Sequence, residues 1–137
     1  MALTSEQKAN LLRRLADEVY SQGKLGIADE ITTEDMVYES PTVYCSGREE
    51  CKRHMATLRS VWSGLVVDVM DLKVEGDEVS ARLTFSGLHV RDFLGVPASN
   101  KPFAVSGNVV AEVREDRVCR VDVTYLINDF FRQVDGD

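Results

Sequence analysis

The chain has 137 residues, 44% of them hydrophobic and 28% charged, a composition that predicts one compact domain with a single core. A formal net charge of −7 argues against a nucleic-acid partner, because binding to a phosphate backbone requires a basic face. The first ten residues are polar, and no apolar run approaches the roughly 20 residues of a membrane helix. We therefore expect a cytoplasmic protein without a membrane partner.

Three helices are predicted in the first half of the chain. The first begins at a Thr4 or Ser5 cap and ends before Gly23, because leucine and valine residues recur between them at helical spacing. A second, short helix fits residues 25–31, and a third follows Gly47. The apolar face of the third helix is formed by residues three or four positions apart, namely Cys51, Met55, Leu58 and Trp62.

The segment 36–44 is predicted to be extended and to be broken by Pro41. Either Tyr38 or Glu39 faces the interior there, because side chains alternate along an extended chain. An inward Tyr38 would contact a ligand, whereas an inward Glu39 would be a buried acid suited to proton transfer. His54 lies off the apolar face of the third helix and is predicted to be solvated.

From residue 65 onward, β-branched residues dominate and turn signals divide the chain into four predicted strands. The strands are 66–74, 78–90, 103–114 and 117–127, and a longer loop at 91–101 is a candidate lid. Helices followed by an antiparallel meander predict an α+β fold, in which the helices cover one face of a curved sheet. The three cysteines, Cys45, Cys51 and Cys119, lack metal-type spacing and are expected to be reduced structural thiols, with no metal site.

Strand alternation predicts which side chains face the helices. The inward row of the strand 78–90 ends at His89, whose imidazole either moves protons at a pocket mouth or holds the following loop. In the last strand the inward row is Cys119, Val121, Val123 and Tyr125, and the Tyr125 hydroxyl either binds a substrate carbonyl or simply packs. Asp122 then faces the other side, unless a β-bulge shifts the register by one residue. An apolar face of this kind encloses either a packed core or a ligand cavity.

Aromatic side chains are frequent on the elements that surround this face. They would line or close a pocket, or else form plain core. The residues concerned are Trp62, Phe85, Phe93, Phe103, Phe130 and Phe131.

Several short motifs carry a family resemblance: EDMVYESP at 34–41, GRE at 47–49, GLH at 87–89, FLGVP at 93–97 and NDFFRQV at 128–134. In this order they resemble the SnoaL-like polyketide cyclases of the nuclear-transport-factor-2-like superfamily, over almost the whole chain. The resemblance implies a single domain over residues 1–137, a cone-shaped α+β barrel with a deep apolar pocket. It also implies association into a homodimer or tetramer through the outer face of the sheet. Cyclases of this family close polyketide rings without a cofactor, by an intramolecular aldol step that uses a carboxylate late in the last strand.

The last two strands depart from the family pattern. The position of the catalytic aspartate falls on Val123, and two polar pocket positions of the preceding strand fall on Gly107 and Val109. The sequence thus predicts a cofactor-free cyclase or isomerase of a small apolar substrate, with His89, Asp122 and Tyr125 as candidate catalytic residues. A non-catalytic binding protein of the same fold is the alternative. The candidate substrate-binding residues are Tyr38, Glu39, Trp62, Phe85, Phe93, Val109 and Val123.

Overall fold

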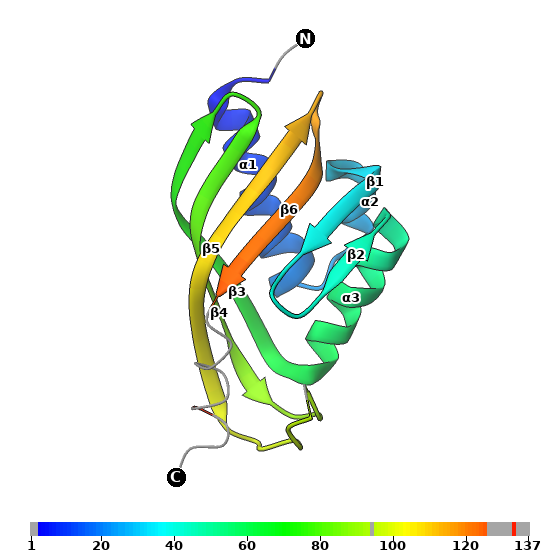
Figure 1. Cartoon of the computed structure of the whole chain (residues 1–137), viewed down its shortest axis with the longest axis vertical. Coiled ribbons are helices and arrows are strands. Elements are labelled where there is room, and N and C mark those ends of the chain that lie inside the picture. Colours follow the sequence, from blue (N-terminus) through cyan, green and yellow to red (C-terminus); the bar gives the residue numbers. More distant parts are fainter. Residues whose placement is uncertain (1–2, 94, 126–132, 134–137) are drawn as a thin grey trace.

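A computed structural model describes residues 3–93, 95–125 and 133 of the chain. Its helical elements are α1 (Ser5–Arg14), the π-helical segment η1 (Leu15–Ser21), the 3-10 turn η2 (Leu25–Ile27), α2 (Ala28–Ile31) and α3 (Arg48–Val61). Its strands are β1 (Thr32–Glu39), β2 (Tyr44–Ser46), β3 (Trp62–Glu75), β4 (Glu78–His89), β5 (Pro102–Arg114) and β6 (Arg117–Tyr125). Figure 1 shows the helices against one face of a curved sheet, which confirms the predicted α+β fold.

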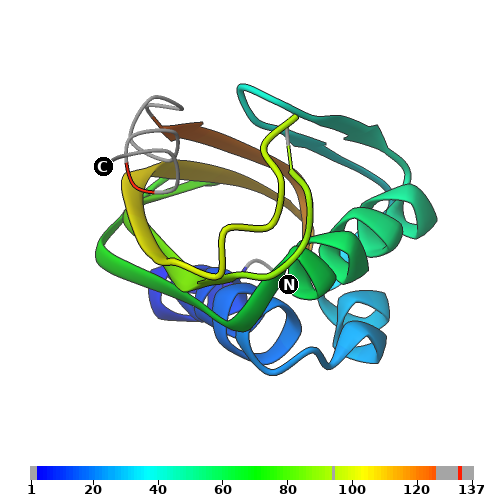
Figure 2. The same cartoon turned by 90° about the horizontal axis from the view of Figure 1, so that it is seen from below.

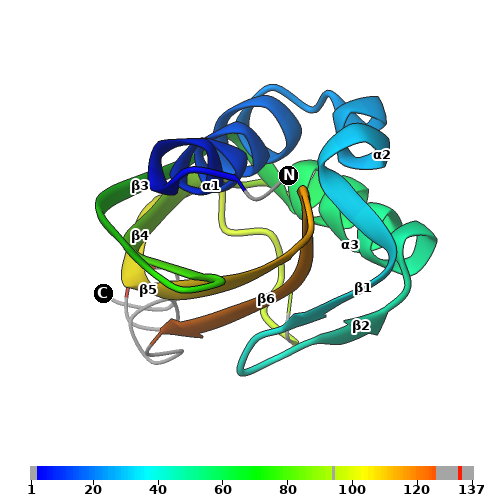
Figure 3. The same cartoon turned by 90° about the horizontal axis from the view of Figure 1, so that it is seen from above.

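The described strands form one six-stranded sheet in the order β2-β1-β6-β5-β4-β3. All neighbouring pairs are antiparallel except β1 and β6, which are parallel. The four strands predicted from residue 65 onward are β3 to β6, and β1 and β2 add two more strands to the sheet. The segment around Pro41 is a hairpin rather than one broken strand, because Tyr38 of β1 pairs with Cys45 of β2. Figures 2 and 3 show that the sheet curls around an interior, whose open side is closed by the helices.

The first helix begins where the sequence predicts. Thr4 and Gln7 form a reciprocal capping box, in which each side chain accepts a hydrogen bond from the other residue's backbone N–H (3.1 and 2.8 Å). The helix continues as η1, and Arg59 of α3 donates from Nη1 to the carbonyl oxygens of Tyr20 and Ser21 (2.7 and 2.6 Å). The end of η1 is thereby tied to α3. No helix among the described residues is long and apolar enough to span a membrane.

A β-bulge in β6 decides which of its side chains face the core. Glu112 of β5 pairs with Arg120, whereas the next residue, Val113, pairs with Val118, so Cys119 is the extra residue. Val118 is fully buried in place of Cys119, which the sequence wrongly placed in the inward row. Beyond the bulge the alternation is regular again, and Val121, Val123 and Tyr125 face inward as predicted.

A second packed cluster surrounds Trp62, which is the first residue of β3 and not part of the third helix. Its ring centroid lies 4.0 Å from that of Phe103, 5.0 Å from that of His89 and 5.2 Å from that of Phe93. Trp62 therefore joins the end of β4 and the following loop to the core.

Candidate functional site

A cavity of about 80 Å³ lies between the inner face of the sheet and the helices. At about 10–15 Å³ of such volume per water molecule, it has room for roughly five to eight waters. At about 30 Å³ of liquid volume per molecule, these waters correspond to roughly 150–240 Å³. Most of the wall is aliphatic, and the contributing residues include Leu12, Leu15, Val67, Val69, Leu83 and Val121.

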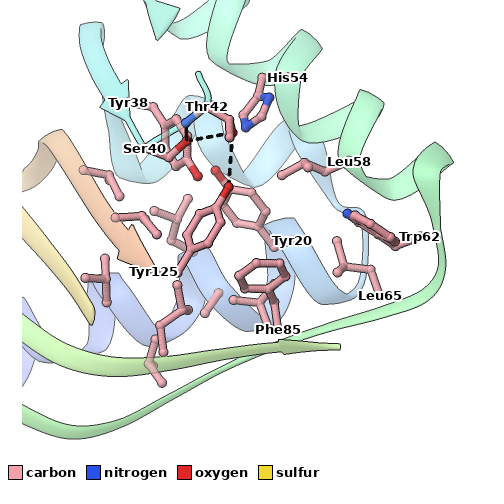
Figure 4. A pocket seen from close by; sticks show the side chains of 18 of the residues that line it. Tyr20, Tyr38, Ser40, Thr42, His54, Leu58, Trp62, Leu65, Phe85 and Tyr125 are labelled. Carbon is pink, nitrogen blue, oxygen red and sulfur yellow. Dashed lines mark hydrogen bonds between the residues drawn. The ribbon is translucent and has the colours of Figure 1, made fainter. Parts of the chain in front are cut away.

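The polar groups that line the cavity come from segments far apart in the sequence. They are the hydroxyls of Tyr20, Tyr38, Ser40, Thr42 and Tyr125, the imidazole of His54, and the indole of Trp62. Figure 4 shows Tyr38, Ser40, Thr42 and His54 together at one end, with the Tyr125 hydroxyl pointing toward Thr42. Trp62, Leu65 and Phe85 lie at the other side. None of the described lining residues is an aspartate, glutamate, lysine or arginine.

The turn between β1 and β2 positions two of these hydroxyls. Ser40 N donates to Val43 O (2.8 Å), and the Ser40 Oγ accepts in return from Val43 N (3.2 Å) and Thr42 N (3.4 Å). The turn holds Thr42 Oγ1 at 3.1 Å from the Tyr125 hydroxyl. The β1–β2 hairpin and the last described strand thus meet at a hydroxyl pair in the cavity wall.

The imidazole of His54 lies against Tyr38, with the ring centroids 4.9 Å apart and the planes at 41°. His54 Nε2 is buried and has no hydrogen-bond partner among the described residues. Burial lowers the pKa of His54 below its ordinary range, so the ring is neutral at pH 7. Burial likewise raises the pKa of Tyr20 and of Tyr38, so both hydroxyls keep their protons.

Seven of the residues proposed from the sequence line this cavity: Tyr38, Trp62, Phe85, Phe93, Val109, Val123 and Tyr125. Phe103 instead packs against Trp62 in the neighbouring cluster. Phe130 and Phe131 lie outside the described residues. The loop 91–101 contributes Phe93 to the wall, as expected of a segment that covers the cavity.

His89 does not line the cavity, although it is fully buried. Its Nδ1 accepts a hydrogen bond from Ser99 N (3.3 Å) and lies 3.0 Å from Ser99 Oγ. Its backbone N donates to Lys101 O and its carbonyl accepts from Asn100 N. The imidazole therefore holds the loop that returns to β5, which is the second of its two predicted roles.

Glu39 and Asp122 lie on the outer face of the sheet rather than in the cavity. Arg120 donates to both carboxylate oxygens of Asp122 (2.9 and 3.0 Å) and lies 3.6 Å from Glu39. The bulge at Cys119 precedes Asp122, so normal alternation turns this carboxylate outward once Val121 and Val123 face in. Glu39 points outward because Tyr38 points in.

The prediction missed His54 because the apolar face of α3 includes more residues than the four assigned to it. It was predicted to be solvated, but it stands three residues after Cys51 and four before Leu58, the spacing of one apolar face. Tyr20 follows Ala16 at the same four-residue spacing. Nothing in the local sequence marks Ser40 and Thr42, since their position depends on the pairing of β1 with β6. The described residues contain no group of three or more side chains suited to hold a metal ion.

A helix-covered, curled sheet around a cavity is the architecture of the nuclear-transport-factor-2-like proteins. A protein from Catenulispora acidiphila DSM 44928 with a ketosteroid isomerase-like fold, solved with trimethylamine, shares it at 15% identity and a TM-score of 0.78. That match covers 91% of this chain and 92% of the other.

Two solved structures are more similar. TsrD from Streptomyces laurentii is 25% identical with a TM-score of 0.86, over 96% of this chain and 97% of TsrD. A proposed SnoaL-like polyketide cyclase from Jannaschia sp. CCS1 is 20% identical with a TM-score of 0.87, and the match covers 100% of this chain and 99% of the other. The family model for SnoaL-like polyketide cyclases matches residues 10–129, and the chain belongs to this family. A comparison with curated protein sequences finds no match.

Proposed function

We propose that this protein is a cofactor-free cyclase or isomerase of a small, apolar, oxygenated biosynthetic intermediate of polyketide or related type. One observation carries the proposal beyond family membership. A neutral imidazole, that of His54, lies in an otherwise apolar cavity together with several hydroxyl groups. Such a site suits proton transfer at a carbon next to a carbonyl group.

In the proposed reaction, His54 Nε2 takes a proton from the carbon beside a substrate carbonyl. The Tyr125 hydroxyl donates a hydrogen bond to the carbonyl oxygen as negative charge develops there. The resulting enolate carbon attacks a second carbonyl of the same molecule, and the new alkoxide recovers the proton from the imidazolium. One carbon–carbon bond forms and no atom is lost. The apolar walls hold the folded substrate and exclude water.

Proton exchange tests this step without knowledge of the natural substrate. The protein is incubated with 2-tetralone in D₂O, and exchange of the protons beside the carbonyl is followed by NMR. General-base catalysis is typically worth about 10²–10⁴-fold, so His54→Gln should remove most of the protein-dependent rate. Asp122→Asn is the matched control, because this carboxylate pairs with Arg120 outside the cavity. Exchange by His54→Gln at the wild-type rate would refute the role of His54.

A non-catalytic ligand-binding protein is the second candidate. Its supporting observation is that no carboxylate lines the cavity among the described residues. The family resemblance also implies that Val123 stands where other members have an aspartate. This alternative predicts that 2-tetralone binds and that its exchange rate stays at the buffer value.

We also propose that copies associate as a homodimer or tetramer through the outer face of the sheet. Val66 and Met70 of β3 are each 45% exposed, and they alternate with Val67 and Val69 of the cavity wall. Light scattering with size-exclusion chromatography tests this association.

A further inference from the structure

The direction of the hydrogen bonds around Thr42 follows from what Ser40 already accepts. A hydroxyl oxygen has two lone pairs, and the Ser40 Oγ receives hydrogen bonds from two backbone N–H groups, those of Thr42 and Val43. It has little capacity left to accept a third hydrogen. Ser40 therefore acts toward the neighbouring hydroxyl groups as a donor.

The Thr42 hydroxyl has two oxygen neighbours among the described residues, the Ser40 Oγ at 3.5 Å and the Tyr125 hydroxyl at 3.1 Å. Because Ser40 has little acceptor capacity left, Tyr125 is the better of the two acceptors for the hydrogen of Thr42. When Thr42 donates in this way, the hydrogen of Tyr125 points away from Thr42. Since Tyr125 lines the cavity, its O–H is available to an acceptor on a bound ligand.

The charge of the surroundings restricts which acceptor can enter. The described lining residues include no lysine or arginine, and burial holds Tyr20 and Tyr38 in their neutral, protonated forms. A carboxylate placed here would lose its hydration without gaining a counter-charge, which is costly. The net charge of −7 adds a long-range repulsion. A neutral carbonyl oxygen needs only a hydrogen-bond donor.

We propose that the cavity selects uncharged ketones and esters over carboxylates, binding one carbonyl oxygen through the Tyr125 hydroxyl, with Thr42 as the residue that positions this donor. This proposal rests on the proposed function, because it names the substrate class of the same cavity. It concerns binding, however, and is tested without turnover.

The test compares three ligands of nearly equal shape: cyclohexyl methyl ketone, cyclohexanecarboxylate and ethylcyclohexane. Trp62 lines the cavity and is the one tryptophan of the chain, so its fluorescence reports occupancy of this site, with isothermal titration as a second readout. At pH 7 the ketone is expected to bind at least about ten times more tightly than the carboxylate. Equal or tighter binding of the carboxylate, or no binding of the ketone, would overturn the proposal.

Two variants test the positioning role of Thr42. Thr42→Val keeps the side-chain shape and removes the donor, so ketone affinity should fall by about 3- to 10-fold, the usual range for one hydrogen bond. Affinity for ethylcyclohexane should stay the same, because this ligand has no oxygen. Thr42→Ser should restore ketone binding, and Tyr125→Phe should lose at least as much as Thr42→Val.

If Thr42 has only a structural role, Thr42→Val should lower the affinities for the ketone and for ethylcyclohexane by the same factor. This result would refute the positioning role. The outcome is independent of proton exchange. If wild-type protein fails to exchange 2-tetralone but prefers the ketone, the proposed catalysis is wrong and the recognition proposal stands. If the protein exchanges 2-tetralone but does not prefer the ketone, the recognition proposal is wrong and the proposed catalysis stands.

Discussion

Gly107 offers a sharp test of the packing behind the site. It lies in β5 and pairs with Tyr125 of β6 and with Leu83 of β4. A Cβ at this position would lie 2.9 Å from the Cβ of Tyr125 and would overlap the carbonyl oxygen of Thr124. Ordinary van der Waals contact begins at 3.4 Å, so the contact with Tyr125 alone would require β5 and β6 to separate by about 0.5 Å, and the overlap with the Thr124 carbonyl oxygen would require more.

Overpacking of a well-packed region costs about 1–3 kcal/mol, so Gly107→Ala should lower the free energy of unfolding by that amount. The usual gain of alanine over glycine within a strand, about 0.5–1 kcal/mol, offsets only part of this cost. Urea unfolding followed by Trp62 fluorescence measures the difference. Because Tyr125 is displaced, affinity for cyclohexyl methyl ketone should fall as well.

Gly26→Ala is the matched control. A Cβ at Gly26 has no heavy atom within 4 Å, and the residue lies in a 3-10 turn with an ordinary φ. Its replacement is expected to be neutral or to stabilise by up to about 1 kcal/mol, through the unfolded chain. If Gly107→Ala were as stable as the wild type while Gly26→Ala behaved as expected, the close approach of β5 and β6 would be refuted.

Three further predictions concern titratable groups. Burial depresses the pKa of His54 below 6.5, so the unfolded chain binds more protons than the folded chain. The stability that the neutral imidazole contributes is therefore present above about pH 6.5 and is lost as the pH falls toward the folded pKa. In urea titrations from pH 5 to 8, the free energy of unfolding of His54→Gln should depend less on pH than that of the wild type. His89→Phe keeps a ring but removes the acceptor of the Ser99 amide hydrogen. Hydrogen exchange of this amide, measured by mass spectrometry or NMR, should accelerate at least about tenfold. An unchanged exchange rate would contradict the role of His89 in holding the loop. Burial raises the pKa of the Cys51 thiol to about 12. Iodoacetamide at pH 8 should therefore modify the partly exposed Cys119 first, and Cys51 only after unfolding. Labelling of Cys51 before Cys119 in peptide mass spectra would refute this order.

Local periodicity located the helices and most of the inward faces of the strands, although it misplaced His54 and Trp62. The capping residue Thr4 and the rows that contain Val109, Val123 and Tyr125 follow from rules that act over a few residues. The same rules failed at Cys119, because a bulge is set by the pairing of β6 with β5 and not by β6 alone.

The polar part of the site depended on contacts that local rules cannot describe. His89 does end an inward row, but Trp62 begins β3 beside it, and the imidazole faces Ser99 instead of the cavity. Thr42 and Tyr125 are 83 positions apart and meet through the parallel pairing of β1 with β6. Of the polar lining residues that were not predicted, His54 and Tyr20 were within reach of the sequence, through their helical spacing from Cys51, Leu58 and Ala16.

The central place of β6 in the sheet has a consequence for synthesis on the ribosome. β6 is the last described strand to leave the exit tunnel, yet it separates β1 from β5 and carries Val121, Val123 and Tyr125 of the cavity wall. Until β6 inserts, the β1–β2 hairpin has no sheet to join, and β5 has one unpaired edge. Such long-range pairing slows folding and leaves that edge exposed to other chains. A nascent chain therefore stays without this cavity, and vulnerable to aggregation, until β6 has left the exit tunnel.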